Sequence, residues 1–281
     1  MPIKEVTWRE KSHDIYEGVP VATLTSDFGE KWPESQVELA LHRENPSARL
    51  IVLAQISRYS ITEGGFILLK SYKLAPRHSI HIGVVDPDVG TERKGLVIKT
   101  RDFWFVGPDN GLLYPAAENN GIEDVFEIDN NRINTTGSNT FHGRDIFGPV
   151  AGRLLGGEHP ERFARPISTE EIIKRTFKPT EVVQVDPYGN VKLAGSPEAP
   201  DRRLLLDDQV IVRTDKGNLA FPFKKSFGYV GEGQPVAYRG SHETLELAVR
   251  LGRGDEFLGG VQIGQVLEIT PEYRSGVAIT I

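Results

Sequence analysis

The spacing of apolar residues changes near residue 175. Before that point, short apolar runs alternate with segments of helical character, and this alternation predicts an α/β domain with a mostly parallel sheet. The predicted strands are PVATLTS (20–26), ARLIVLAQIS (48–57), SIHIGVVD (79–86), GLVIKT (95–100) and FWFVG (103–107). The predicted helices are ESQVELALHREN (34–45), ITEGGFILLKSYKL (61–74) and FGPVAGRLLGG (147–157).

After residue 175, alternating or continuous apolar runs lie between Gly, Asp and Asn turns, a pattern typical of strands and hairpins. These runs are EVVQVDPYGNVKL (181–193), QVIVRTDKGNLAF (209–221), GQVLEIT (264–270) and GVAITI (276–281), and one helix-like segment, HETLELAVRLG (242–252), interrupts them. The sequence therefore predicts an N-terminal α/β domain over residues 1–174 and a smaller, mainly β domain over residues 175–281.

Composition narrows the classes of protein to consider. The chain of 281 residues has a formal net charge of −6, which gives no support for a nucleic-acid-binding surface. It has no Cys, so disulfides, thiolate metal sites and a thiol nucleophile are excluded. No apolar run approaches the roughly 20 residues that span a bilayer, and the first twenty residues are too charged for a signal peptide. We therefore expect a soluble, cytoplasmic protein.

Polar residues gather where the predicted strands end. Thr25, Ser26 and Asp27 follow the first strand, Asp86 ends the third, and GPDNG (107–111) follows the apolar run FWFV. In open α/β sheets, ligands bind outside the carboxyl ends of the strands, so these residues are candidates for a site. Aspartates in such places are also common caps of turns and helices, and GPDNG has ordinary turn chemistry.

A further polar cluster lies in TFHGRDIFG (140–148), at the start of a predicted helix. Helix N-termini favour anions and oriented donors, which makes His142, Arg144 and Asp145 candidates for a site. Each also has a purely structural interpretation, with His142 packed in a core and Arg144 paired locally with Asp145. The cluster alone does not decide between these interpretations.

Six motifs occur along the chain in a fixed order. They are TLTSDFG (23–29), VVDPDVGTER (84–93), FVGPDNGLL (105–113), TFHGRDIFGPVAG (140–152), VDPYGN (185–190) and RGSHETLELAV (239–249). From Val21 to its C-terminus the chain resembles the S-adenosyl-L-methionine hydrolase family, the SAM hydroxide adenosyltransferases, which are relatives of fluorinating and chlorinating enzymes. The resemblance implies an α/β N-terminal domain, a mainly β C-terminal domain and a homotrimer whose active sites lie between neighbouring subunits.

The resemblance also implies a reaction, the hydrolysis of S-adenosyl-L-methionine to adenosine and L-methionine, with no metal or other cofactor. The positive sulfur makes methionine a good leaving group, so a water that is held and aligned can attack C5′ in line. The positions that match the family's water-handling residues are Asp86, Arg93 and His142. An Arg–carboxylate pair fixes geometry, Asp86 can accept a proton from the attacking water, and His142 can orient that water.

Two substrate-binding positions fall in the predicted N-terminal domain. Asp27 matches the aspartate that binds the ribose hydroxyls in the family, and a carboxylate that accepts from two hydroxyls is a sensible clamp. Tyr59 falls where the halogenating relatives have a Trp in the pocket wall, although it could equally pack in a core.

Four more positions fall in the predicted C-terminal domain. Asp186 matches the residue that binds the methionine ammonium, and Ser241 matches one that contacts the methionine carboxylate. Tyr188 and Asn190 match an aromatic residue and an amide at the adenine. Core packing remains the alternative for Tyr188, and a turn position after Gly189 remains the alternative for Asn190.

Two other functions stay open. A halide-using transferase is disfavoured, because the halogenating relatives have a neutral residue at the position of Asp86. A carboxylate repels a halide at 4 Å by about 4 kcal/mol at an effective dielectric of 20. A non-catalytic adenosine-binding trimer is the other alternative, because the nucleoside wall departs from the family pattern at Asp88, Ala194 and Arg250. The three retained water-handling residues argue against such a binder.

Overall fold

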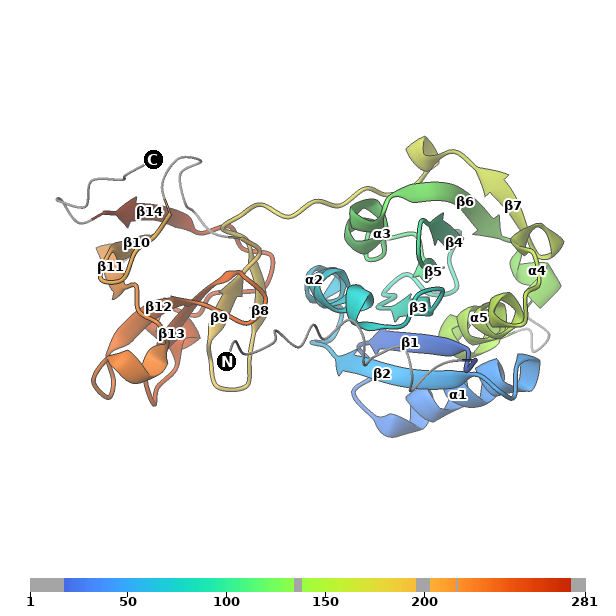
Figure 1. Ribbon diagram of the computed structural model, residues 1–281, viewed down its shortest axis with the longest axis horizontal. Helices are drawn as coiled ribbons and strands as arrows, with labels where there is room; N and C mark the ends of the chain where they lie inside the picture. The colour runs from blue at the N-terminus through green and yellow to red at the C-terminus, as the bar shows by residue number, and fades with distance from the viewer. Residues whose placement is uncertain (1–17, 134–137, 196–202, 216, 274–281) are drawn as a thin grey trace, which may run out of the picture. The chain divides into compact units, whose positions relative to one another are not determined.

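The computed structural model describes residues 18–133, 138–195, 203–215 and 217–273. The chain forms two compact units, Met1–Arg175 and Thr176–Ile281 (Figure 1). The predicted boundary, between residues 174 and 175, lies one residue before this division. Among the described residues, no helix is both long enough and apolar enough to cross a bilayer.

The first unit is built on a seven-stranded sheet of order β2-β1-β3-β5-β4-β6-β7 (Figure 1). The strands are β1 (Val21–Ser26), β2 (Arg49–Gln55), β3 (Ile80–Val84), β4 (Gly95–Thr100), β5 (Trp104–Pro108), β6 (Ile122–Ile128) and β7 (Ala164–Ile167). Strands β2, β1, β3 and β5 are parallel, whereas β4, β6 and β7 extend the sheet by antiparallel pairs. Because β6 again runs in the direction of β5, most strands point one way, and the predicted fold class is confirmed.

Helices cover both faces of this sheet (Figure 1). On one face lie α1 (Lys31–Glu44), the π-helical turn η2 (Gly143–Phe147) and α5 (Gly148–Leu155), and on the other lie α2 (Ile61–Ser71) and α3 (Tyr114–Asn120). The shorter helical segments are η1 (Tyr72–Leu74), α4 (Asn130–Ile133), η3 (Pro160–Arg162) and η4 (Thr169–Glu171). Helices α1 and α5 approach closely, because a Cβ on Gly152 would lie only 2.6 Å from the Leu41 carbonyl oxygen.

The central strands are apolar at nearly every position because helices cover both faces of the sheet. Successive residues of a strand point to opposite faces, so Val97 belongs to one core while Leu96 and Ile98 belong to the other. A strand buried on both faces needs apolar residues at every position, which explains the continuous apolar runs. Strands β1, β3 and β5 are parallel neighbours, so their carboxyl ends meet at one edge of the sheet.

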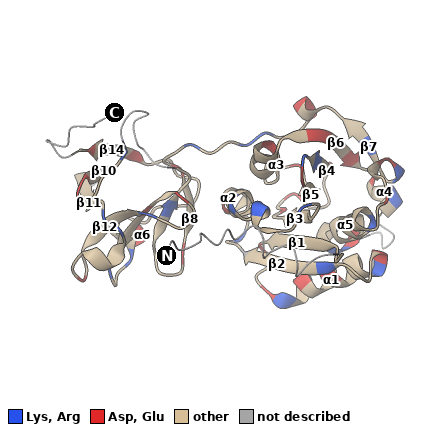
Figure 2. Ribbon diagram, in the orientation of Figure 1, with Lys and Arg blue, Asp and Glu red and all other residues tan. Residues whose placement is uncertain are grey.

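The second unit contains two antiparallel sheets around one core. The four-stranded sheet has the order β12 (Pro235–Arg239), β13 (Leu245–Val249), β9 (Val191–Leu193) and β8 (Val182–Val185). The three-stranded sheet has the order β11 (Gly217–Pro222), β10 (Gln209–Thr214) and β14 (Glu268–Glu272), and the short helices are η5 (Phe227–Tyr229) and α6 (Gly254–Phe257). Lys and Arg are interspersed with Asp and Glu over the described elements of both units (Figure 2).

One predicted element is wrong. Residues 242–252 do not form a helix, because their central part is β13, which pairs with β12 on one side and β9 on the other. All five residues of β13 (LELAV) are buried, so apolar and polar residues do not alternate along it. Leu245, Ala248 and Val249 also have the i, i+3, i+4 spacing of a helix, which explains the wrong prediction. The predicted strand GVAITI (276–281) lies outside the described residues. The sequence interpretation also missed α3, β6, β7 and β12.

Candidate active site

Asp86, Arg93 and His142, the residues that the family resemblance predicts to handle the water, form one contiguous group, here called the water-handling cluster. Arg93 Nε donates to Asp86 Oδ1 at 2.9 Å and to Oδ2 at 3.1 Å, and Arg93 Nη2 also donates to Oδ2. The same Nη2 lies 2.7 Å from His142 Nδ1. The side chains of Asp86 and Arg93 are 5% and 9% exposed, and His142 is buried, so water screens the cluster only weakly.

The turn after β3 brings Arg93 back to Asp86. The Val89 N–H donates to the Asp86 carbonyl, and Gly90 adopts a positive φ of 82°, a conformation that glycine tolerates best. A Cβ at Gly90 would overlap the carbonyl oxygen of Asn139. Asp88 is exposed and lies outside the left-handed region of backbone space, so aspartate fits there without strain.

The contact with Arg93 fixes the tautomer of His142. A guanidinium can only donate hydrogen bonds, so His142 Nδ1 accepts and the ring proton of the neutral imidazole sits on Nε2. Burial and then the positive charge of Arg93 lower the pKa of His142, while Asp86 and Asp145 oppose this shift. The imidazole is therefore neutral with an N–H donor at Nε2. Phe147, whose ring centroid lies 5.3 Å from the Arg93 guanidinium carbon, packs against the cluster.

The neighbouring pair Arg144 and Asp145 has the structural role that the sequence left open. Arg144 Nε donates to Asp145 Oδ1 at 2.7 Å and Arg144 Nη2 donates to Oδ2 at 2.8 Å. Arg144 also donates to Gln36 of α1 at 3.0 Å. The pair thus fastens η2 to α1 and does not belong to the water-handling cluster.

Asp27 and Tyr59 also come together in the first unit. Asp27 is half-buried after β1, and its Oδ2 accepts the Tyr59 backbone N–H at 2.8 Å. Tyr59 has a φ of 61°, and its side chain is largely exposed, so it is not a core residue of this unit. Neither Asp27 nor Asp86 caps a helix: Glu30 is the N-cap of α1, and the Asp86 carboxylate is held by Arg93.

The GPDNG motif supplies two supporting residues that the sequence interpretation did not assign. Asn110 donates to the carbonyl of Val85, the residue before Asp86, at 2.6 Å. Asp109 is buried, accepts the Ile173 N–H at 2.8 Å, and has its pKa raised by that burial. The polar residues of GPDNG were noted in the sequence, but a turn motif does not reveal which distant residues it contacts. The hydrogen bond from Asn110 to Val85 was therefore not predicted.

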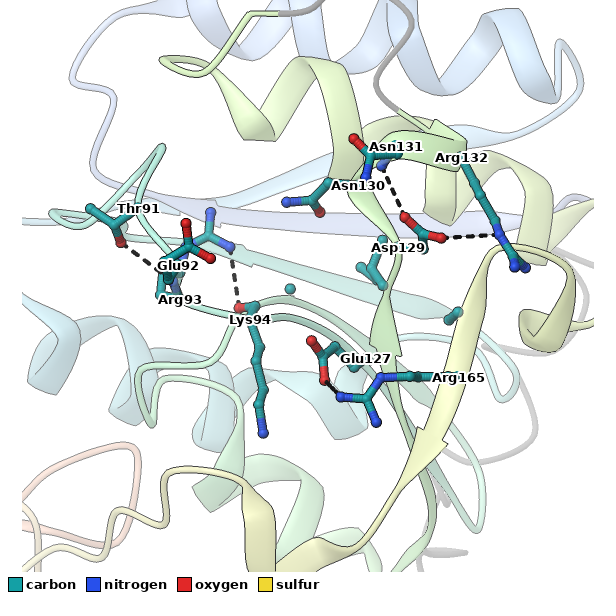
Figure 3. A pocket seen from close by; sticks show the side chains of 13 residues that line it. Thr91, Glu92, Arg93, Lys94, Glu127, Asp129, Asn130, Asn131, Arg132 and Arg165 are labelled. Carbon is teal, nitrogen blue, oxygen red and sulfur yellow. Dashed lines mark hydrogen bonds and ion pairs between the residues drawn. The ribbon is translucent and has the colours of Figure 1, made fainter.

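A polar hollow of about 370 Å³ borders Arg93 from the side of β6 and α4 (Figure 3). Figure 3 shows two pairs among its charged side chains, Arg132 with Asp129 and Arg165 with Glu127. These two pairs balance four of the charges that line the hollow. In the described part of the chain, no three His, Asp or Glu side chains are grouped so that they could hold a metal ion.

The second unit has a cavity of about 820 Å³, here called the open cavity. Its lining includes all four substrate-binding residues predicted for this unit, Asp186, Tyr188, Asn190 and Ser241, together with Tyr238, Glu246, Arg250 and Arg253. The structure thus brings the four predicted residues together, and it places Arg250, a departure from the family pattern, in the same wall. Ala194 is not part of this lining.

The Asp186 carboxylate organises the turn between β8 and β9. Its Oδ1 accepts the backbone N–H groups of Tyr188 at 3.0 Å and Asn190 at 2.9 Å, and its Oδ2 accepts the Asn190 side-chain amide at 2.9 Å. The turn interpretation of Asn190 is therefore correct as far as its backbone is concerned. Tyr188 is 77% exposed and does not pack in the core of this unit.

Comparison with known proteins identifies the family. The profile of the SAM hydroxide adenosyltransferase N-terminal domain matches residues 22–164, and that of the C-terminal domain matches residues 180–268. An (R)-S-adenosyl-L-methionine hydrolase from Salinispora tropica is 34% identical over 82% of this chain and 89% of its own length. Another from Methanocaldococcus jannaschii is also 34% identical, over 61% of this chain and 65% of that relative, which is slightly less than two thirds.

Two further comparisons bear on fold and function. The crystal structure of an uncharacterized conserved protein from Thermotoga maritima matches with a TM-score of 0.78 at 32% identity, covering 89% of this chain and 100% of that one. A fluorinase from an Actinoplanes species is more distant, at 28% identity over 51% of this chain and 53% of its own length. Both domain profiles and the similarity to the Salinispora hydrolase show that this chain belongs to the SAM hydroxide adenosyltransferase family.

Proposed function

We propose that this protein hydrolyses S-adenosyl-L-methionine to adenosine and L-methionine. The observation that carries the proposal is the buried water-handling cluster beside the carboxyl end of the parallel strand β3. The hydrolase names of the relatives support the same reaction.

The proposed chemistry is a direct displacement. The oxygen of a bound water attacks C5′, the C5′–S bond breaks, and its electron pair neutralises the sulfonium, so that methionine leaves as a thioether. The water must lose a proton as the new bond forms, and Asp86 is the acceptor. His142, neutral and protonated on Nε2, donates to the water oxygen and directs its lone pair toward C5′.

Asp86 keeps capacity for this role despite its contacts with Arg93. A carboxylate offers about four lone-pair sites, and the three N–H···O contacts from Arg93 leave one of them on Oδ1. Arg93 also fixes the orientation of the carboxylate, which a lone aspartate would not have. The cluster is therefore a positioned base whose charge is balanced before substrate arrives.

The remaining predicted residues hold the substrate in this proposal. Asp27 binds the ribose hydroxyls, and Tyr59, exposed beside it, forms part of the wall. In the open cavity, Tyr188 and Asn190 contact adenine, while Asp186 and Ser241 contact the methionine ammonium and carboxylate.

We further propose that the active form is a cytoplasmic homotrimer in which chains complete one another's sites. The groups assigned to water and ribose belong to the first unit, and those assigned to adenine and methionine belong to the second. Three large side chains that line the open cavity, Tyr188, Phe227 and Leu251, are exposed, which is typical of a surface that a partner covers. Refolded mixtures of Asp186→Ala and Asp86→Ala chains, each inactive alone, test this assembly by recovery of activity.

A halide-using reaction is the second candidate, and the observed cluster disfavours it. A halide in place of the water would face the buried Asp86 carboxylate, at a cost of about 4 kcal/mol at 4 Å and a dielectric of 20, which Arg93 offsets only in part. The deciding experiment is incubation with S-adenosyl-L-methionine, with and without chloride, and identification of the nucleoside. Adenosine in both samples supports hydrolysis. A 5′-chlorinated nucleoside would instead show a halogenating enzyme, and unchanged substrate would show a binding protein.

A further inference from the structure

The backbone carbonyl of Lys94 joins the water-handling cluster to a second set of hydrogen bonds. This oxygen accepts an N–H of Arg93 Nη1 at 3.2 Å (Figure 3) and the backbone N–H of Asp109 at 2.9 Å. The contact uses a nitrogen of Arg93 that binds neither Asp86 nor His142. The guanidinium is therefore held to the backbone of Asp109 as well as to its partners in the cluster.

Asp109 in turn is hydrogen-bonded to the end of the first unit. Its Oδ1 accepts the backbone N–H of Ile173 at 2.8 Å, and the residue is only 8% exposed. Burial raises the pKa of Asp109, while the Ile173 N–H and the positive charge of Lys94 partly offset this shift. A buried carboxylate that loses its donor is costly, so the contact with Ile173 is a strong constraint on both residues. The second unit begins three residues later, at Thr176.

Residues 171–175, here called the connecting segment, are attached to the first unit at two further points. The Lys94 ammonium donates to the Glu171 carbonyl at 3.2 Å, and Arg175 Nη2 donates to Thr62 Oγ1 at 2.7 Å. Lys94 thus contacts the connecting segment with its side chain and the water-handling cluster with its carbonyl. One residue is shared by the chemistry and by the chain that leads to the second unit.

Asp109 is the buried link in this arrangement, because its carboxylate binds Ile173 and its N–H binds Lys94. We propose that Asp109 is a positioning residue, which holds Lys94 and thereby Arg93 in place and couples the cluster to the connecting segment. A shift of that segment would move Arg93, and with Arg93 the carboxylate of Asp86. As a statement about catalysis, this inference rests on the proposed hydrolysis.

Two substitutions of Asp109 separate its hydrogen bond from its charge. Asp109→Ala removes the acceptor, whereas Asp109→Asn removes the charge and keeps an oxygen that can accept the Ile173 N–H. We expect kcat to fall roughly 10-fold in Asp109→Ala with KM little changed, because misplaced catalytic groups slow the reaction without weakening binding. Asp109→Asn should keep most of the wild-type rate. Rates are expressed per folded chain, with the folded fraction taken from denaturant titrations.

Ile173→Pro removes the same hydrogen bond from the other side and leaves Asp109 intact. Ile172 has a φ of −104° and a ψ of 155°, an extended backbone that a following proline permits. This variant should match Asp109→Ala, whereas Ile173→Ala, which keeps the N–H, should have the wild-type rate. The double variant of Asp109→Ala and Ile173→Pro should be no slower than either single variant, since both break one contact. A combined loss of roughly 100-fold, the product of the single effects, would overturn the coupling.

His142 supplies a measurement that does not depend on turnover. Arg93 Nη2 lies 2.7 Å from His142 Nδ1, and the positive charge of Arg93 helps to lower the pKa of His142. If Asp109→Ala displaces Arg93, the pKa of His142 in an NMR titration should rise relative to wild type. Loss of the negative charge of Asp109 would by itself lower that pKa, so Asp109→Asn should show no rise.

The outcomes separate this inference from the function on which it rests. Absence of adenosine in the wild-type assay would overturn the proposed hydrolysis, while a raised pKa of His142 in Asp109→Ala would still support the positioning role. An unchanged kcat together with an unchanged pKa of His142 in Asp109→Ala would overturn the inference alone. Equal losses of kcat in Asp109→Ala and Asp109→Asn would also overturn it, because the charge and not the hydrogen bond would then matter. If Asp109→Ala does not fold, Ile173→Pro and Ile173→Ala give the same test.

Discussion

The water-handling cluster and the open cavity differ in burial and in how their side chains are held. In the first unit, Asp86, Arg93 and His142 are buried, mutually hydrogen-bonded and supported by Asn110 behind the strand end. In the second unit, the predicted ligand residues line an open cavity bordered by exposed aromatic and aliphatic side chains. Under the proposed function, this difference means that the groups assigned to the chemistry are already held in position within one chain. The open cavity, by contrast, keeps exposed apolar side chains at its border.

The largest expected effect comes from removing the charge of the cluster. Asp86→Asn should lower kcat by roughly 10²- to 10⁴-fold, the usual contribution of a general base, while adenosine binding changes little. Asp88→Asn is a matched control two residues away, where the side chain is exposed, and it should retain wild-type rates. Steady-state kinetics with calorimetric titration of adenosine measures both quantities. Wild-type turnover by Asp86→Asn would show that Asp86 only holds Arg93 in place and is not the proton acceptor.

Mixing variants tests whether the two regions meet between chains. Asp86→Ala and Asp186→Ala should each be inactive, and they should regain activity when unfolded and refolded together. In a randomly mixed trimer with shared sites, each site has one chance in two for each intact unit, so about a quarter of sites recover. Asn190→Ala replaces Asp186→Ala if loss of the turn carboxylate prevents folding. No recovery from a well-folded mixture, or a fully active monomer in light scattering, would contradict the assembly.

The contrast between the regions shows what a sequence can and cannot specify. Asp86 was a candidate because it ends a buried strand, whereas its grouping with Arg93 and His142 followed from the family resemblance. In the sequence 49 residues separate Arg93 from His142, and only the fold brings them within 2.7 Å. The α/β layer was predictable because strands buried on both faces leave uninterrupted apolar runs. The aspartate at a strand end and the apolar runs are both signals of local sequence.

The failures come from tertiary context. The segment LELAV satisfies helical spacing as well as strand burial, and only its pairing with β12 and β9 decides between them. The Asp186 carboxylate accepts hydrogen bonds from its own turn, and Glu246 is buried. Both facts depend on side-chain positions that the spacing of residues in the sequence does not encode. The supporting role of Asn110 was hidden for the same reason, because its partner is a carbonyl 25 residues earlier.

Acid should lower the stability of the first unit through His81. His81 is fully buried in the first unit, where it lies 2.8 Å from Thr23 Oγ1, and burial lowers its pKa from 6.5 to about 3. Below pH 6.5 the unfolded chain binds a proton that folded His81 does not, so the stability of the first unit falls as pH decreases toward 3. The loss is roughly 2 kcal/mol at pH 5.

Tryptophan fluorescence reports on this transition, because Trp32 and Trp104 lie in the first unit and the sequence of the second unit contains no Trp. Denaturant titrations between pH 7 and pH 4 should show the fall in wild type and a smaller fall in His81→Gln. His159→Gln is the matched control, since His159 is exposed and hydrogen-bonds only its own turn. An unchanged pH dependence in His81→Gln would mean that other groups control acid stability.

Removing the charge of Asp27, the residue proposed to bind the ribose hydroxyls, should have a more modest effect. Asp27→Asn replaces one of the two acceptor oxygens with an amide, so adenosine should bind about 10-fold more weakly, while kcat at saturation changes less. Calorimetric titration and steady-state kinetics distinguish this result from that of Asp86→Asn. A fall in kcat with unchanged adenosine affinity would move Asp27 from binding to chemistry.

The smallest expected effect is that of a chelator, which should leave turnover unchanged. The sulfonium already makes methionine a neutral leaving group, so the displacement needs no Lewis acid at sulfur. In the proposed mechanism Asp86 accepts a proton from the water and His142 donates to it, so a metal-bound hydroxide is not needed either. Dialysis against EDTA followed by assay of adenosine release makes the measurement, with readdition of Mg²⁺, Mn²⁺ or Zn²⁺ as the control. Activity that is lost on chelation and restored by one of these ions would show that the water is activated by a metal, and the assignment of Asp86 as proton acceptor would then fail.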